Sequence, residues 1–137
     1  MELLVNVDVP DVARAVDFYR NALGLALVRH LFDGSVAEMA GASARIFLLQ
    51  KAGGEPATGA SRPVRDYGRH WTPVHLDFVV EDVDAALRRA RDAGAAVESG
   101  VRSHPWGRLA LLADPFGNGF CLVELGERGY DAVETSG

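Results

Sequence analysis

Apolar and polar residues alternate at the start of the chain. The valines at the odd positions from Val5 to Val9 fall on one face of an extended strand, while Asn6 and Asp8 fall on the other, because successive side chains of a strand point to opposite sides. The alternation predicts a half-buried strand over residues 3–9.

A helix should follow this strand. Asp11 stands where a helix N-cap is expected, and apolar residues recur behind it with helical spacing, from Val12 to Tyr19. Gly24 suits the left-handed conformation that ends many helices. Three short apolar segments at about 25–31, 35–40 and 45–50 are separated by turn-forming residues, so this half of the chain is predicted as strand, helix and three strands.

Residues 51–73 lose all apolar periodicity and are rich in Gly and Pro, which predicts a linker. The segment carries a local positive patch, made of Arg62, Arg65, Arg69 and His70. A solvated connector is the favoured interpretation, because most charged loops are exposed, and an anion-binding lid is the alternative. Tyr67 and Trp71 lie in the same stretch and could cover a neighbouring cavity.

The second half repeats the first at an offset of 71 residues. Asp82 takes the place of Asp11, and the apolar face that begins at Val83 matches the face that begins at Val12. Gly94 should close this helix, and strands are predicted at about 95–101, 108–114 and 119–125. The chain is therefore expected to be a single α+β domain of two βαβββ modules, about 3–50 and 74–125.

The offset also superimposes the segment from His75 to Val80 on the first strand. Leu76 and Phe78 match the buried valines, while His75 and Asp77 fall on the face that also carries Asn6 and Asp8 in the first copy. A polar group buried without a partner costs roughly 1–3 kcal/mol. These four side chains should therefore meet water, a ligand or one another, and the two curved half-sheets should enclose a concave pocket.

Composition excludes several classes of partner. The 137 residues are enough for one domain with a sizeable core, and the net charge of −5 argues against nucleic-acid binding. No apolar run approaches the roughly 20 residues needed to cross a bilayer, and the first residues lack the cationic start of a signal peptide, so a cytoplasmic location is expected. Cys121 is the only cysteine, which leaves no internal disulfide.

The repeat and two motifs resemble the vicinal oxygen chelate superfamily, which includes glyoxalase I, bleomycin-resistance proteins and extradiol dioxygenases. The motifs are the segment 74–82, VHLDFVVED, and the turn 114–121, DPFGNGFC. The resemblance covers nearly the whole chain and implies a curved mixed sheet around a concave pocket, and commonly a homodimer. It specifies function weakly, because members include isomerases, lyases, dioxygenases and proteins that only sequester a drug.

In metal-dependent members, ligands on four strands hold a divalent ion on the concave face. By this resemblance the first-strand position falls on Leu4, which cannot ligate, the fifth-strand position on His75 and the eighth-strand position on Cys121. The fourth strand offers only Gln50, and Glu124 has the opposite strand parity. A divalent metal held by His75, Cys121 and Gln50 is thus possible, but no metal or other cofactor is expected.

Other residues complete the candidate site. Without a metal, His75 is expected to line the cavity and Cys121 to act as a small buried hydrophobic residue. Trp106 lies in a turn, either at the cavity mouth or packed against the sheet edge, and Trp71 could cover the cavity from the linker. If chemistry occurs, His75 is a candidate ligand or general base, and Glu38 and Asp8 are candidate acids. The predicted ligand-binding set is Asn6, Asp8, Trp71, His75, Asp77, Trp106 and Cys121.

These observations predict a metal-independent protein of bleomycin-resistance type that binds a small organic molecule. The alternative is a glyoxalase-like lyase or isomerase, or a dioxygenase, that uses a divalent metal near His75. The expected partners are the small organic ligand and a second copy of the chain. Neither nucleic acid nor a membrane is expected as a partner.

Overall fold

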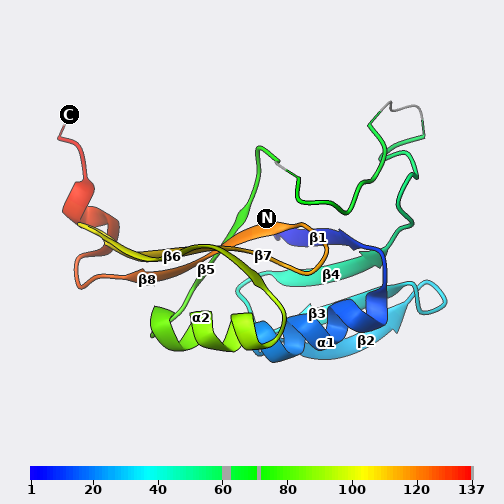
Figure 1. Ribbon diagram of the computed structural model, residues 1–137, viewed down its shortest axis with the longest axis horizontal. Coiled ribbons are helices and arrows are strands. Elements are labelled where there is room, and N and C mark those ends of the chain that lie inside the picture. The colour runs from blue at the N-terminus through cyan, green and yellow to red at the C-terminus, as the bar shows by residue number, and fades with distance from the viewer. Residues whose placement is uncertain (60–62, 71, 137) are drawn as a thin grey trace.

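A computed structural model describes residues 1–59, 63–70 and 72–136, and it shows two four-stranded mixed sheets and two helices. One sheet has the order β1-β4-β3-β2 and the other the order β5-β8-β7-β6, without closure into a barrel. In Figure 1, α2 lies below the strands of the second sheet, α1 overlaps β2 and β3, and connector residues 63–70 pass above the strands. The α+β fold predicted from the repeat is confirmed.

The elements follow the predicted order. The first module comprises β1 (Leu4–Val9), α1 (Val12–Leu23), β2 (Ala26–Leu31), β3 (Val36–Ala40) and β4 (Arg45–Gln50). The second comprises β5 (Leu76–Val79), α2 (Val83–Asp92), β6 (Ala96–His104), β7 (Gly107–Ala113) and β8 (Gly119–Leu125), and a short 3-10 helix, η1 (Gly129–Val133), follows. β6 runs three residues beyond its predicted end, because Pro105 and Trp106 alone form the turn into β7.

Each helix is capped twice at its N-terminus, in the same way. The carboxylates of Asp11 and Asp82 accept hydrogen bonds from backbone N–H groups three residues on, at 3.1 Å and 3.0 Å. A second side chain comes from the strand beside the helix: Gln50 Oε1 accepts from Val12 N at 3.0 Å, and Glu124 Oε1 accepts from Val83 N at 3.2 Å. Both modules therefore satisfy the first orphan amides of their helix.

The helix-facing side of each sheet forms the hydrophobic core. Leu48 and Met39 of the first module and Leu112 and Leu122 of the second are at most 1% exposed. Val9 is fully buried as well, whereas Asn6 on the opposite face of β1 is exposed. The period-two pattern therefore places apolar side chains against the helices, as the sequence predicts.

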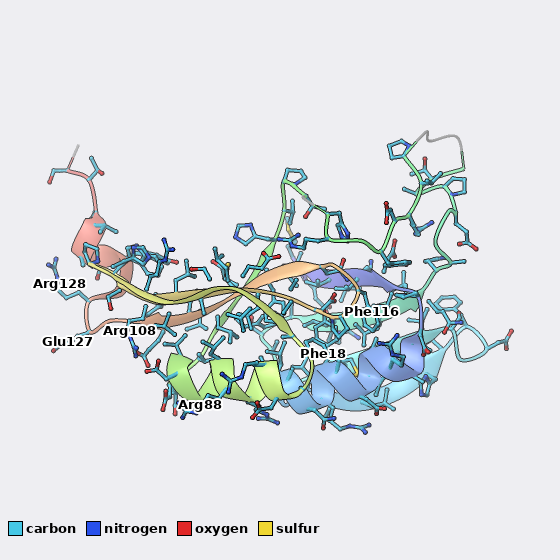
Figure 2. The ribbon with its side chains drawn as sticks, viewed as in Figure 1. Phe18, Arg88, Arg108, Phe116, Glu127 and Arg128 are labelled. Atoms are coloured by element: carbon cyan, nitrogen blue, oxygen red, sulfur yellow. The ribbon has the colours of Figure 1, made fainter. Side chains whose placement is uncertain are left out.

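The two modules meet along a seam of helix and turn contacts. Tyr19 on α1 is buried and donates a hydrogen bond to Asp114 Oδ2 at 2.7 Å, and this burial together with the carboxylate raises the pKa of the Tyr19 phenol. Asn118 Nδ2 donates to the Asp8 carbonyl at 3.3 Å. Phe116 fills the same end of the seam, near α1 (Figure 2). These contacts hold one end of the seam closed.

At the other end of the second sheet, Arg108 joins β7 to α2, and it is labelled above that helix in Figure 2. Its Nη1 donates to Asp84 Oδ2 at 2.8 Å and its Nη2 to Asp84 Oδ1 at 3.1 Å, a bidentate pair. This hydrogen bonding lowers the pKa of the Asp84 carboxyl. The pair orients the first turn of α2 on its sheet.

The described members of the connector's positive patch have polar partners in the folded protein. Arg65 Nε donates to Asp8 Oδ2 at 2.7 Å, Arg69 pairs with Glu98 on β6, and His70 Nε2 lies 3.0 Å from Asn118 Oδ1. Most described residues of this segment are exposed, as predicted for a solvated connector, and the structure adds ion pairs to carboxylates remote in sequence. Arg62 and Trp71 lie outside the described residues.

Across the described ranges, neither helix has the length and hydrophobicity that a bilayer crossing requires.

Candidate functional site

Three of the predicted site residues gather on the face of the second sheet that points away from its helix. Asp77 on β5 and Cys121 on β8 are direct neighbours in the parallel ladder, and His75 immediately precedes β5. Their ligating atoms lie within 4.8 Å of one another. His75 Nε2 is 3.3 Å from Asp77 Oδ1. We call these three residues the polar trio.

Cys121 is the buried member of the polar trio, at 4% exposure. Burial raises the pKa of its thiol to about 12, and a hydrogen bond to Asp77 adds to the effect. The thiol is therefore protonated at neutral pH and donates to the Asp77 carboxylate. A protonated thiol is a poor nucleophile and a poor metal ligand.

Native Cys121 should resist thiol reagents. With a pKa of about 12, about one thiol in ten thousand is ionised at pH 8, so we expect DTNB to label the folded protein far more slowly than the protein unfolded in guanidinium. Asp77→Asn removes the neighbouring charge and should accelerate labelling. Full labelling of the native protein within the mixing time would contradict this protonation state.

A small polar pocket of about 150 Å³ lies beside the trio. Arg69 and Thr72 of the connector, Glu98 of β6 and the side chains of His75 and Cys121 surround it. Hydrogen bonding to Arg69 lowers the pKa of the Glu98 carboxyl, so this ion pair stays charged. Arg69 therefore lines the pocket with its positive charge already paired with Glu98, and it does not offer an unpaired charge to an anion.

Glu38, the second catalytic candidate, lies in the other module. It is 4% exposed on β3, between Arg29 Nε at 3.2 Å and Arg45 Nη1 at 3.3 Å. Arg45 also binds the carboxylate of Glu2, and its pKa is raised by that hydrogen bond. Glu38 is thus compensated within its own sheet, and the structure does not bring it together with His75.

The remaining predicted site residues are dispersed. Asn6 and Asp8 lie on β1, and Asp8 is held by Arg65. Trp106 packs at the distal turn of β6 and β7, stacked on His104 at 5.0 Å and 5.4 Å from Tyr130 of η1. It does not line the pocket beside His75, so the edge-packing alternative describes it. Trp71 falls outside the described residues.

A metal at this site would have to use the polar trio. Gln50, the third ligand considered from the sequence, shares the strand face of the buried Leu48 and caps α1, so it is not available to His75. His75, Asp77 and Cys121 match zinc in the kind of donor atom. Zinc binding there would displace the proton that burial and Asp77 keep on the Cys121 thiol of the free protein.

A cleft of about 750 Å³ lies between the modules. Its walls are mostly apolar and come from β1, the end of α1, the 41–44 turn, β5 and the start of α2. Asp77 is one of the few charged residues in the wall, with Arg89. The cleft has the size of pockets that enclose a drug-sized molecule.

Small residues explain why this end of the seam is open. The closed end is filled by Tyr19 and Phe116, both buried. The cleft end is lined instead by small residues, namely Gly41, Ala42, Ser43 and Ala44 of the turn before β4 and Ala85 and Ala86 of α2. The two modules therefore meet tightly on one side only.

Sequence reasoning missed this cleft. It predicted a pocket on the polar faces of the strands, whereas the cleft walls are the apolar residues assigned to the core, such as Val5 and Phe78, together with Ala85 and Ala86 of α2. The available signal was the run of small residues from Gly41 to Ala44, which lines the cleft. Among the predicted site residues that the structure describes, Asp77 alone also belongs to the cleft wall.

Comparison with known proteins gives the same fold and a family. The chain is 38% identical over 133 residues to the anthracycline biosynthesis protein DnrV of Streptomyces peucetius, covering 89% of this chain and 40% of that protein. The corresponding protein DauV of Streptomyces sp. strain C5 is 37% identical over 128 residues, with 85% and 38% covered. The chain thus spans about two fifths of the length of these curated relatives.

Solved structures of other proteins have the same fold as this chain. TnmS3, an antibiotic binding protein from Streptomyces sp. CB03234, is similar over 92% of this chain and 96% of its own, with 27% identity and a TM-score of 0.65. A glyoxalase/bleomycin resistance protein/dioxygenase family enzyme from Burkholderia phytofirmans PsJN has a TM-score of 0.71 at 17% identity, covering 90% of this chain and 97% of that one, which shows the fold. The glyoxalase-like domain model matches residues 4–123, so this chain belongs to the glyoxalase-like domain family.

Proposed function

We propose that this protein binds a flat, mostly apolar organic molecule in the cleft between its modules, without a metal. The observation that carries the proposal is the cleft itself, whose volume of about 750 Å³ and apolar walls suit a polycyclic ligand. Burying such a ligand stabilises the complex by roughly 25 cal/mol for each Å² of apolar surface removed from water.

The relatives support this class of ligand. Two of them are anthracycline biosynthesis proteins and one is an antibiotic binding protein. Anthracyclines contain a fused, planar ring system with a large apolar surface, which apolar walls can cover. The protonated thiol of Cys121 supports binding without a metal, because zinc would first have to displace that proton.

Titration calorimetry with 2-hydroxyanthraquinone tests the proposal. The protein is dialysed against EDTA before the titration, and we expect saturable binding of one molecule for each chain. Unchanged affinity after addition of zinc or manganese would support metal independence. Absence of binding to this probe and to unsubstituted anthraquinone would contradict the proposed function.

An enzyme that uses a metal is the second candidate, and the close approach of His75, Asp77 and Cys121 favours it. Metal analysis of protein purified without chelators separates the two functions. One equivalent of zinc, nickel, manganese or iron that is lost in His75→Ala would favour the enzyme.

We further propose that two copies associate through the outer edges of β1 and β5. Each of these strands has a hydrogen-bonded neighbour on one side only within the described sheets. Leu3, Leu4, Val74 and Val79, in or beside these strands, are exposed large apolar residues. Light scattering coupled to size exclusion should give the mass of a dimer, and the double variant Leu4→Glu/Val79→Glu should give that of a monomer.

A further inference from the structure

Arg89 is the cation of the cleft wall, and the other module holds it in place. It belongs to α2, but its Nε donates to the Asn21 carbonyl at 2.7 Å and its Nη2 to the Arg20 carbonyl at 3.4 Å, both near the end of α1. A Cβ added to Gly24, the C-cap of α1, would stand 3.1 Å from Nη1 and 3.3 Å from Nη2. The guanidinium is therefore packed on the C-terminal cap of α1, at the wall of the cleft.

Part of this guanidinium remains available to a ligand. A guanidinium has five N–H donors, and the two hydrogen bonds to α1 leave Nη1 of Arg89 without a hydrogen-bond partner among the described residues. Within the same residues no carboxylate forms an ion pair with Arg89. The carbonyls at the end of a helix carry only a partial negative charge, which stabilises a cation without neutralising it. Arg89 thus presents a fixed positive charge with a free N–H group.

The acidic residues nearest to the cleft are engaged elsewhere. Asp77, the other charged residue of the wall, is the neighbour of Cys121 in the ladder and accepts a hydrogen bond from its thiol. That contact lies on the sheet face that points away from α2, whereas Arg89 belongs to α2 itself. Asp84, in the first turn of α2, is bound by Arg108. The positive charge of Arg89 is therefore left for a group on the ligand.

We infer that Arg89 binds an anionic oxygen group, such as a carboxylate, at the edge of the ligand in the cleft. The inference rests on the proposed function and specifies its ligand class as flat aromatic acids. The apolar walls cover the rings, and a guanidinium N–H donates a charge-assisted hydrogen bond to the acid. Because α1 already fixes the side chain, ligand binding costs little additional ordering of Arg89.

Three probes that share one ring system test this selectivity. Anthraquinone-2-carboxylate carries a negative charge, anthraquinone-2-carboxamide is its neutral counterpart of nearly equal shape, and anthraquinone lacks the group. We expect the unaltered protein to bind the carboxylate about tenfold more tightly than the carboxamide, the lower end for a charged hydrogen bond because Arg89 is exposed. Raising NaCl from about 20 mM to about 500 mM should reduce this ratio, because salt screens exposed charges.

Arg89→Gln should bring the ratio of carboxylate to carboxamide affinity close to one, because only the carboxylate loses a charged partner. The matched control is Arg88→Gln, the same change at the preceding residue of α2, which is labelled in Figure 2. Arg88 is exposed and lines neither hollow, so this control should keep the full ratio. Arg89→Lys keeps the charge and should retain part of the preference. A role of Arg89 only as a cap of α1 predicts equal losses for all three probes.

The outcomes separate this inference from the proposed function. A ratio near one in the unaltered protein, or a preference that survives in Arg89→Gln, overturns the role of Arg89 and leaves cleft binding intact. Failure of all three probes to bind overturns the proposed function and this inference together. A melting curve shows whether each variant folds, and if Arg89→Gln does not, Arg89→Met, which keeps an apolar stem of similar length, takes its place.

Discussion

Filling the cleft from two walls is expected to weaken the binding of 2-hydroxyanthraquinone by at least about 100-fold. The double variant Ala42→Trp/Ala86→Trp places one indole in the turn before β4 and one on α2, and both positions line the cleft. A loss of this size corresponds to roughly 2.7 kcal/mol of binding free energy. It follows from removing the space in which the ligand buries its apolar surface.

The control makes the same two changes elsewhere. Ala13 on α1 and Ala96 on β6 are exposed and line neither hollow, so Ala13→Trp/Ala96→Trp should bind the probe within about twofold of the unaltered protein. Calorimetry measures both variants, and a melting curve for each shows whether it folds. Equal affinity of the filled and unaltered proteins would place the ligand outside the cleft.

The largest stability effect is expected at Gly107, where β7 begins. Its φ of +153° lies in the range that side chains rarely adopt, and a Cβ there would stand 2.2 Å from the carbonyl oxygen of Glu124 on β8. Since the atom it meets is backbone, the hairpin itself would have to shift. We expect Gly107→Ala to lower the free energy of unfolding by roughly 3 kcal/mol.

Guanidinium denaturation followed by circular dichroism measures this loss. Gly100, in the middle of the neighbouring strand β6, is the matched control, because nothing lies within 4 Å of a Cβ added there. Gly100→Ala should stay within about 1 kcal/mol of the unaltered protein. Coincident denaturation curves for the two variants would show that β7 and β8 tolerate the shift.

The strand face on which several site residues lie was predictable from the sequence. Strand alternation puts His75 and Asp77 on one face, and the same parity leaves Glu124 on the helix side, where it caps α2. The pairing of Asp77 with Cys121 was not predictable, because it depends on the register of two parallel strands that lie more than 40 residues apart in sequence. The protonation of the Cys121 thiol depends on that register as well.

For the charged residues too, the local sequence pattern did not predict the partners that the tertiary structure provides. The sequence predicts Arg65 and Arg69 in a solvated connector and Glu38 as a candidate acid. In the structure each has a charged partner, from a segment distant in sequence or from the neighbouring strand. Nothing in the local pattern around an arginine tells which carboxylate the folded chain will bring to it. Long-range ion pairs are consequences of packing.

By itself, the sequence determined the two βαβββ modules, the order of their elements and the face on which each side chain lies. These follow from interactions between residues close in the chain: period-two and period-3.6 burial, helix caps and turns. Only the tertiary structure decided how the modules meet. Tyr19 and Phe116 close one end of their seam, while small residues leave a cleft at the other. The size of such a space depends on side chains that come together from both halves of the chain.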